Sequence, residues 1–536
     1  MDRRRFLGRG ALAGAAALAP RTAAPHEPVP RKQTPPFEFE EATVAALQER
    51  MARGELTAGA LTVACLDRIA AIDRDGPALR HVIETNPDAL RVAAQLDEER
   101  AAKGARGPLH GIPVLLKDNV DTADRMTTTA GSLAMAGSIP DRDAFLAQRL
   151  RAAGAVLLGK ANMSEWAKIR SPRSSSGWSA RGGQARNPYA LDRNPCGSSS
   201  GSAAAVSANF APLAIGTETD GSIVCPSSAN GIVGIKPTLG LVSRAGVIPI
   251  AHSQDTAGPM ARTVRDAAVL LSFLTGADPR DAATAQSAGR THPDYASFCD
   301  KDGLRGARIG VARKFFGRDA RVDALMEAAL QAMKAAGAVL VDPVDLGPGS
   351  DYEQTELEVL LYELKADLGA YLAATPKAPV RTLADVIRFN DEHRDTEMPF
   401  FGQELFLQAQ EKGGLETPAY RKALANNLRL SRTEGLDAAF KKHRVEALVA
   451  PTGGPAWLTD LVNGDHFTGV SSSTPPAVAG YPAITVPAGF IFGLPIGITF
   501  MGGAWSEPAL IKLAYAYEQQ TRHRAAPRLL PSVPLS

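Results

Sequence analysis

Several residue types that would place this chain in a particular class of protein are scarce or absent. Its 536 residues include four cysteines and nine histidines, without a Cys-x-x-Cys pair or a His-Glu-x-x-His segment, so neither common zinc signature is present. Four cysteines are also too few for a disulfide-stapled scaffold. The net charge of +2 gives no reason to expect a nucleic-acid partner. No run of about 20 apolar residues is present, so we expect no transmembrane span.

The first 30 residues have the pattern of an export signal. Residues 3–7 read Arg-Arg-Arg-Phe-Leu, which contains an arginine pair, one free position and then Phe-Leu. An alanine-rich apolar segment follows at 11–19, with small residues at 22–24, and this order is typical of a signal peptide. The sequence therefore predicts a twin-arginine signal and cleavage region over 1–30, and export to the periplasm. The alternative is a basic tail without a targeting role.

After a proline-rich joint at 28–36, the sequence predicts one large α/β domain over 37–530. The chain is 45% hydrophobic and 22% charged, which suits a large core. Helical patterns fill 37–103, and short apolar runs then alternate with helical periods, which favours a mixed central β-sheet surrounded by helices. Strands are expected at 113–116, 155–158, 213–216, 308–311, 338–341, 447–450, 483–486 and 496–500. Helices are expected at 144–152, 202–209, 263–275, 322–336, 351–373, 422–442 and 508–520.

Ser222 stands in a context that suits nucleophilic catalysis. It follows Gly221, and a glycine turn lets successive backbone N–H groups face one point, where they can stabilise an oxyanion. A serine hydroxyl becomes a good nucleophile only when a base takes its proton. Taken alone, Ser222 is an ordinary serine in a glycine-containing turn.

Lys117 is the candidate base because it ends the mostly apolar run 112–116. Burial lowers a lysine pKa and leaves some neutral amine to accept a proton. The alternative is a structural ion pair with Asp118. Ser198 lies in the Gly/Ser run 197–202, where the backbone can adopt costly conformations, and it would relay a proton between Lys117 and Ser222. Its alternative is a flexible serine-rich loop.

Together these segments resemble the amidase signature family. The resemblance rests on Gly197-Ser198-Ser199, on Ser222 in a Gly-Thr-Glu-Thr-Asp-Gly-Ser context 24 positions after Ser198, and on an apolar-Lys-Asp sequence at Lys117. It continues through residues 231–238, 255–262 and 480–487, and so covers nearly the whole chain after the predicted signal.

The resemblance implies hydrolysis of a carboxamide to an acid and ammonia through an acyl-enzyme, with no cofactor and no metal. Ser222 would be the acylated nucleophile, Ser198 the bridging serine after a cis peptide bond, and Lys117 the base. Ser199 would support the bridge by hydrogen bonding. The oxyanion hole would consist of the backbone amides of Thr219, Asp220, Gly221 and Ser222.

Four departures from the usual family pattern point to one subgroup. Cys196 stands where the family commonly has glycine, and Glu218 stands where it commonly has aspartate. Asp220 stands in place of glycine or alanine, and Val224 in place of arginine. These changes resemble the peptide amidase subgroup, which removes ammonia from carboxy-terminal peptide amides. Trp178 and Trp457 lie in segments that are similar to that subgroup. Each could line the substrate cleft, or it could pack in the core or at the rim of the cleft.

Cys196 and Cys225 lie close to the two serines in the sequence. An even number of cysteines in an exported protein permits disulfides. We nevertheless expect both to be small buried hydrophobic residues.

The sequence also leaves other functions open. The chain could hydrolyse fatty or aryl amides, or be the glutaminase subunit of a tRNA-dependent amidotransferase, although the export signal argues against a cytoplasmic complex. Residues 197–201 also satisfy Gly-x-Ser-x-Gly, which would make Ser199 the nucleophile of an α/β-hydrolase esterase. That motif needs an apolar strand before it, and residues 189–195 do not read as one. A non-catalytic binding protein that kept the fold is the remaining alternative.

Overall fold

A mixed sheet of eleven strands organises residues 36–347 and 352–534, which are the residues that this computed structural model describes. The predicted signal at 1–30 lies outside the described residues. The strands of the sheet are β1 (Val82–Thr85), β2 (Pro113–Lys117), β3 (Val156–Ala161), β6 (Leu213–Glu218), β7 (Val233–Lys236), β8 (Thr256–Ala261), β9 (Arg308–Val311), β10 (Val339–Val341), β11 (Ala447–Pro451), β12 (Ala483–Ile491) and β13 (Leu494–Met501). A separate hairpin consists of β4 (Trp178–Ser179) and β5 (Gly183–Gln184).

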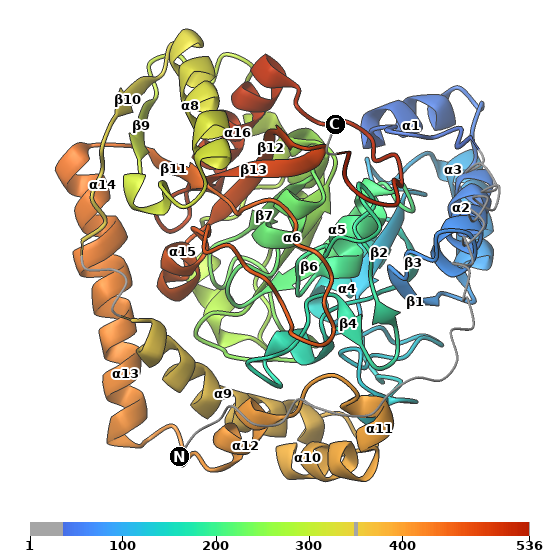
Figure 1. The fold of residues 1–536 in the computed structure, drawn as a ribbon. Coiled ribbons are helices and arrows are strands. Elements are labelled where there is room, and N and C mark those ends of the chain that lie inside the picture. Colours follow the sequence, from blue (N-terminus) through green and yellow to red (C-terminus); the bar gives the residue numbers. More distant parts are fainter. Residues whose placement is uncertain (1–35, 348–351, 535–536) are drawn as a thin grey trace, which may run out of the picture. The chain divides into compact units, whose positions relative to one another are not determined.

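The sheet contains two groups of parallel strands separated by an antiparallel middle, and its edge strand β1 is antiparallel to β3 (Figure 1). Its order is β1-β3-β2-β6-β8-β7-β12-β13-β11-β9-β10. Strands β3, β2 and β6 run parallel, as do β11, β9 and β10, and the other neighbours are antiparallel. Every residue of β2, β3 and β6 is buried, as expected for parallel strands that are covered on both faces.

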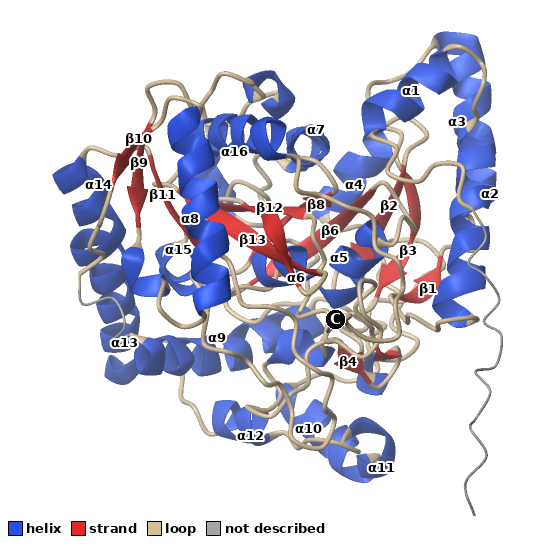
Figure 2. Cartoon of the chain, turned by 45° about the horizontal axis from the view of Figure 1, so that its top comes forward, coloured by secondary structure: helices blue, strands red, loops and turns tan. Residues whose placement is uncertain are grey.

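Helices surround the sheet, and Figure 2 shows the strands running through the middle of the domain with helices around them. The helices are α1 (Val44–Ala52), α2 (Ala58–Arg68), α3 (Ala89–Lys103), α4 (Phe145–Ala152), α5 (Ser200–Ser207), α6 (Val224–Ala229), α7 (Val264–Leu274), α8 (Ala320–Ala335), α9 (Glu353–Ala373), α10 (Leu383–Glu392), α11 (Arg394–Glu397), α12 (Glu404–Gln410), α13 (Pro418–Leu428), α14 (Asp437–His443), α15 (Thr474–Ala479) and α16 (Glu507–Thr521). Among these helices, none combines the length and apolar character that crossing a membrane requires.

Local chemistry explains several helix starts. Thr43, Thr57, Thr263 and Thr382 precede α1, α2, α7 and α10, and each hydroxyl accepts a hydrogen bond from the backbone amide three residues on. Such N-caps satisfy amides that have no partner within the helix. The main apolar core then packs α7, α8 and α16 against strands β8 and β12.

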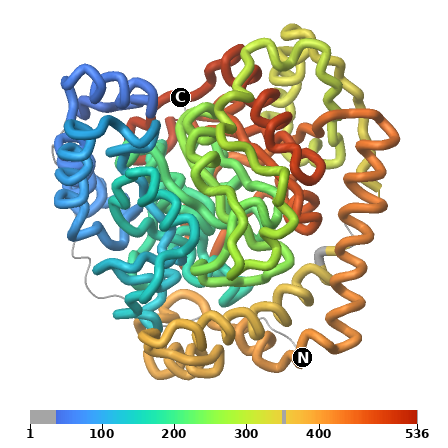
Figure 3. Tube along the Cα trace, turned by 180° about the vertical axis from the view of Figure 1, so that it is seen from behind, coloured from blue at the N-terminus to red at the C-terminus, as the bar shows by residue number. Residues whose placement is uncertain are grey.

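Helices α9, α10 and α12, which lie near one another in Figure 1, contribute to a second apolar cluster. Its members include Leu364, Leu383 and Phe406, which pack with Trp166 and Met135 from the loops beside the sheet. The following helices α13 and α14 are joined by a π-helical stretch, Arg429–Leu436, and form one long rod in Figure 3. This second cluster therefore places α9 and α12 near the loops that follow β2 and β3.

The structure confirms the predicted fold class, a large α/β domain with a mixed sheet surrounded by helices. All eight predicted strands are present, with ends that differ by a few residues. Three strands of the sheet were not predicted, and one of them, β1, interrupts the stretch 37–103 that was expected to be helical. The predicted helix 422–442 contains a kink, because Gly435 has non-helical backbone angles.

The parallel pair β2 and β6 positions the functional residues. Carboxyl ends of neighbouring parallel strands meet at one edge of a sheet, and ligands commonly bind there. Lys117 ends β2 and Glu218 ends β6, so the turn that carries Ser222 begins beside Lys117. Helix α5 packs on both strands and brings the serine-rich segment to the same edge.

Candidate active site

Lys117 and Ser198 form the centre of the site. The Lys117 side chain is fully buried, and its Nζ lies 2.8 Å from Ser198 Oγ. The same Nζ lies 3.1 Å from the carbonyl oxygen of Thr217 and 2.9 Å from Thr217 Oγ1. A neutral amine has two N–H groups and one lone pair. It can therefore donate to both oxygens of Thr217 while its lone pair accepts the hydroxyl proton of Ser198.

Burial makes the neutral form of Lys117 accessible. Desolvation lowers the pKa of Lys117 to about 7, although the charges of Asp255 and Glu218 oppose this shift. A base whose pKa lies near neutral pH is well placed both to accept and to return a proton. A buried lysine with a lowered pKa beside Ser198 has the chemistry of a base, and its catalytic role stays a prediction.

The alternative ion pair between Lys117 and Asp118 is not formed. The Asp118 carboxylate instead accepts hydrogen bonds from the Thr129 hydroxyl and from the Gly131 amide, at 3.0 Å for the latter. Its charged neighbour is Arg181, 4.0 Å away. Asp118 therefore supports the loop after β2 and leaves Lys117 to face Ser198.

Ser198 follows a cis peptide bond from Gly197, as the family resemblance implies. The residue is buried, and its carbonyl oxygen accepts a hydrogen bond from the Ser164 amide at 3.0 Å. The Ser198 backbone is thus held by the loop after β3 while the hydroxyl meets Lys117. This arrangement does not fit a flexible serine-rich loop.

Ser199 supports the site through Thr217 rather than through Ser198. Its hydroxyl donates to the Thr217 carbonyl oxygen at 3.0 Å and accepts from the Thr217 amide at 3.1 Å. The Ser199 amide donates to the carbonyl oxygen of Ser222 at 3.2 Å. Because the Ser199 hydroxyl is buried and occupied, and no described strand leads directly into α5, the esterase alternative does not fit this geometry.

The turn between β6 and α6 presents Ser222. Gly221 has φ +76°, a left-handed conformation that favours glycine, and a Cβ there would also lie 3.0 Å from Ser473 Oγ. In the described part of the chain, the amides of Thr219, Gly221 and Ser222 donate no hydrogen bond. Amides of one turn that have no protein acceptor are available to form an oxyanion hole. The fourth predicted member, Asp220, accepts a hydrogen bond on its carboxylate from the Thr474 hydroxyl at 2.7 Å.

Two carboxylates, the buried Glu218 and the partly buried Asp255, fix this turn, and neither was predicted from the sequence to have a role. Glu218 accepts hydrogen bonds from the amides of Ile223 and Val224 at 2.7 and 3.0 Å, just after Ser222. Asp255 accepts from the Thr219 hydroxyl at 2.6 Å. Burial raises the pKa of Glu218, and it raises the pKa of Asp255 to about 6. Both residues lie in segments that resemble the amidase signature family, but the sequence does not show which backbone and side-chain groups they contact.

Cys196 and Cys225 form a disulfide bond. The expectation that both are separate small hydrophobic residues is therefore wrong. The pairing was hidden in the sequence because 29 residues separate the two cysteines, and only the approach of α5 to α6 brings them together. The other two cysteines, Cys65 and Cys299, are free.

Ser222 opens onto a cleft of about 680 Å³. Its hydroxyl makes no hydrogen bond within the described part of the chain, and the disulfide forms part of the same wall. Trp457 also lines the cleft, and its Nε1 donates to Asp465 at 3.3 Å. A cleft of this size holds a ligand larger than a single amino acid.

Trp178, the second predicted cleft residue, does not line this cleft. Its ring packs edge-on against Phe400 and Phe401, with centroids 5.6 and 5.1 Å away. The guanidinium of Arg170 lies over the ring at 5.6 Å, and the same guanidinium pairs with Glu165 at 2.8 Å. Trp178 therefore belongs to the packing beside the cleft.

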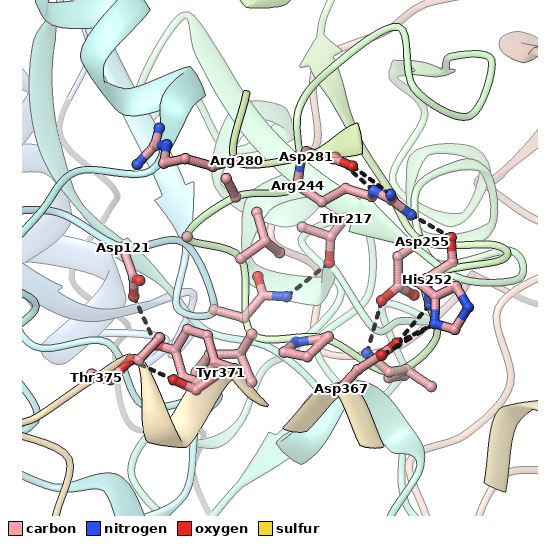
Figure 4. Close-up of a pocket in the computed structure, with 18 of the residues that line it drawn as sticks. Asp121, Thr217, Arg244, His252, Asp255, Arg280, Asp281, Asp367, Tyr371 and Thr375 are labelled. Atoms are coloured by element: carbon pink, nitrogen blue, oxygen red, sulfur yellow. Dashed lines mark hydrogen bonds and ion pairs between the residues drawn. The ribbon is translucent and has the colours of Figure 1, made fainter. Parts of the chain in front are cut away.

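A second pocket of about 470 Å³ is lined by Thr217 (Figure 4). Ala167, Thr219 and Ile250 line both cavities and so form the wall between them. Figure 4 shows Thr217 and Asp255 facing this second pocket, with Arg244 paired to Asp281. Thr217, which holds Lys117, thus lines the second pocket and not the Ser222 cleft.

One group of side chains among the described residues has the composition of a cation site. His252, Glu363 and Asp367 lie close together, but His252 Nδ1 is 2.8 Å from Asp367 and Nε2 is 3.5 Å from Glu363. The hydrogen bond to Asp367 raises the pKa of His252. The contacts of His252 with both carboxylates account for this cluster.

The chain is similar to known proteins over most of its length. The amidase family model matches residues 60–511. A probable amidase of Arabidopsis thaliana is 41% identical over 505 residues, covering 92% of this chain and 93% of that protein. A glutamyl-tRNA(Gln) amidotransferase subunit of Symbiobacterium thermophilum is 36% identical over 500 residues, with 90% and 98% covered. The crystal structure of native peptide amidase from Stenotrophomonas maltophilia superposes with a TM-score of 0.87 at 54% identity, covering 92% of this chain and 99% of that one.

Proposed function

This chain belongs to the amidase signature family and is a hydrolase of amide C–N bonds, and we propose that it removes ammonia from carboxy-terminal peptide amides. We also propose that it acts through an acyl-enzyme on Ser222, with Ser198 and Lys117 moving the protons. The observation that carries this mechanism is the 2.8 Å contact between the buried Lys117 Nζ and Ser198 Oγ.

In the first half of the reaction, neutral Lys117 accepts the hydroxyl proton of Ser198, and Ser198 accepts that of Ser222. Ser222 Oγ then forms a bond to the carboxamide carbon, and the turn amides stabilise the oxygen that becomes negative. When the C–N bond breaks, Ser198 donates a proton to the departing nitrogen, which leaves as ammonia. Lys117 returns its proton to Ser198.

In the second half, water replaces ammonia. Lys117 and Ser198 take a proton from the water as its oxygen bonds to the acyl carbon. The bond between that carbon and Ser222 Oγ breaks, and Ser222 regains its proton. The products are the carboxylic acid and the original enzyme, so no cofactor enters the balance.

The peptide substrate is supported by the cleft and by the relatives. The cleft of about 680 Å³ leads directly to Ser222 and is lined by Trp457 and Phe467. The peptide amidase of Stenotrophomonas maltophilia is similar over nearly the whole chain. Fatty amides, aryl amides and glutamine are the competing substrates, the last because amidotransferase subunits are also relatives.

The first test is ammonia release from a short acetylated peptide amide. We expect release by the protein without residues 1–30 and loss of release in Ser222→Ala. Ser227→Ala is a matched control, because Ser227 is buried in the next helix and does not line the cleft. Release from glutamine, fatty amides or aryl amides but not from peptide amides would overturn the substrate assignment. Unchanged release by Ser222→Ala would overturn the mechanism.

Export remains a separate proposal. It is supported by the twin-arginine pattern at residues 3–7. We expect changing Arg3 and Arg4 to lysine to leave the protein in the cytoplasm with its signal uncleaved. Appearance of the double variant in the periplasm at the normal level would contradict this route.

A further inference from the structure

Two cations on the wall of the Ser222 cleft have no carboxylate partner among the described residues. The charged residues that line this cleft are Lys168, Asp220, Lys314 and Arg318. Lys168 pairs with Asp465 at 2.5 Å, and Asp220 accepts a hydrogen bond from Thr474. Lys314 and Arg318 have no acidic group of the described chain within ion-pair distance. These two cations outnumber the single carboxylate of Asp220, so the lining of the cleft is net positive.

Neighbouring cations on the same segment behave differently. Arg313 pairs with Asp342 at 2.5 Å and with Glu327, while Arg321 pairs with Asp319 at 2.6 Å. Neither Arg313 nor Arg321 lines the cleft. In the segment 313–321, the cations outside the cleft form close ion pairs. The cations facing the cleft form none with the described residues, although the charge of Asp345 acts on Lys314 from a longer distance.

The segment that carries the two free cations is held in place. Arg313 ties it to the turn after β10 and to α8, and the Gly317 amide donates to Asp323 at 2.9 Å. Lys314 Nζ also lies 5.1 Å from the centre of the Phe315 ring, and Phe315 lines the cleft. The positive charge is therefore presented at a defined place on the cleft wall.

The chemistry of the reaction decides which part of a substrate meets these cations. The leaving group of a carboxamide is ammonia alone, so every residue of a peptide substrate lies on the acyl side of the scissile bond. The peptide must extend from Ser222 through the cleft that Lys314 and Arg318 line. An acidic side chain there is attracted by both cations, whereas a free α-ammonium group is repelled.

We propose that Lys314 and Arg318 are specificity residues that select peptide amides with an acidic side chain upstream of the scissile carboxamide and without a free amino terminus beside it. This proposal rests on the proposed function, because it assumes that the acyl group is a peptide. The two residues do not touch Ser222, so their effect belongs in substrate binding.

The test uses acetylated tetrapeptide amides that share one carboxy-terminal residue and carry glutamate, glutamine or lysine at each upstream position in turn. We expect the glutamate peptide to be preferred over its glutamine analogue by about two- to fivefold in kcat/KM at low salt, with the lysine analogue least favoured. The difference should lie in KM and should shrink at high salt, because exposed charges are screened.

Variants locate the effect. Lys314→Gln combined with Arg318→Gln should abolish the preference for glutamate, so that the double variant cleaves the glutamate and glutamine peptides with the same kcat/KM. Lys334→Gln is the matched control, because Lys334 is an exposed lysine of α8 that does not line the cleft. Equal cleavage of the glutamate and glutamine peptides at every position would overturn the proposal, and so would a preference that survives in the double variant.

Binding to Ser222→Ala separates this proposal from the proposed function. Calorimetric titration of the same peptides should show tighter binding of the glutamate peptide, and the double substitution should remove that difference. If binding shows this pattern but the wild-type protein releases no ammonia, the cation sites stand and the peptide-amidase assignment fails. If no peptide binds, both proposals fail.

Discussion

The disulfide between Cys196 and Cys225 joins the two segments that carry the proposed catalytic serines. Cys196 precedes Ser198 by two positions, and Cys225 follows Ser222 by three. The bond therefore closes one loop that contains both serines, and the Ser199 amide adds a hydrogen bond to the Ser222 carbonyl at 3.2 Å. The disulfide and this hydrogen bond together restrict the motion of Ser198 relative to Ser222.

Removal of this disulfide should weaken both folding and catalysis. Changing Cys196 and Cys225 to alanine should lower the free energy of unfolding by about 3–4 kcal/mol, as expected for a closed loop of this size. It should also lower kcat, because Ser198 and Ser222 lose a fixed separation. Urea unfolding and ammonia release measure the two effects. Cys299→Ala is the control, and wild-type protein with the same unfolding midpoint in reductant would contradict the prediction.

Loss of the Lys117 amine should remove most of the catalysis without unfolding the protein. Lys117→Ala should reduce kcat by about 10²–10⁴-fold, the usual contribution of a general base. Lys160→Met is the matched control, because Lys160 is equally buried but contacts Val120 and Thr128 instead of Ser198. Circular dichroism checks the fold of each variant. Full turnover by Lys117→Ala at neutral pH would exclude Lys117 as the base.

The acidic limb of the pH profile should report the protonation of Lys117. Its pKa is lowered to about 7, and only the neutral amine accepts a proton. We therefore expect kcat/KM to rise with pH through about 7 and then to level off. Measurement across this range with a peptide amide, together with a stability control at each pH, tests the assignment. A profile that stays flat from the acidic to the alkaline side of this pKa would contradict it.

Replacement of Asp255 should change the pH at the midpoint of the acidic limb. Its negative charge raises the pKa of Lys117, so Asp255→Asn should lower this pKa and move the limb to lower pH. The variant also weakens the hydrogen bond to Thr219, so kcat should fall as well. The diagnostic quantity is the midpoint of the pH profile. A midpoint that moves upward, or stays in place, would show that Asp255 does not act on Lys117 through its charge.

Thr217 should matter through its hydroxyl. Thr217→Val keeps the shape but leaves Lys117 and Asn119 without their shared acceptor, Thr217 Oγ1. We expect a loss of about 1–3 kcal/mol in unfolding free energy and a lower kcat. Thr217→Ser restores the hydroxyl and should recover most of both. Equal activity of the valine and serine variants would mean that the hydroxyl does not position Lys117.

Much of the fold could be predicted because its signals are local. Short apolar runs in the sequence predicted β2, β6 and β11. Apolar residues at helical spacing predicted α7, α8 and α16. Strands β7 and β8 were missed, since glycine and proline interrupt runs such as Thr256–Ala261. Their strand conformation depends on pairing with neighbours, which no local pattern expresses.

The sequence by itself determined the family, the fold class and the candidate residues Lys117, Ser198 and Ser222, because short motifs specify turns and side-chain types. Only the tertiary structure decided how these groups meet: that Thr217 holds Lys117, that Asp255 supports the Ser222 turn, and that Trp457 but not Trp178 lines the cleft. The tertiary structure alone also showed the disulfide and the two cations of segment 313–321 that face the cleft. Each depends on contacts between segments far apart in the chain, and such contacts are fixed by the packing of the sheet and its helices.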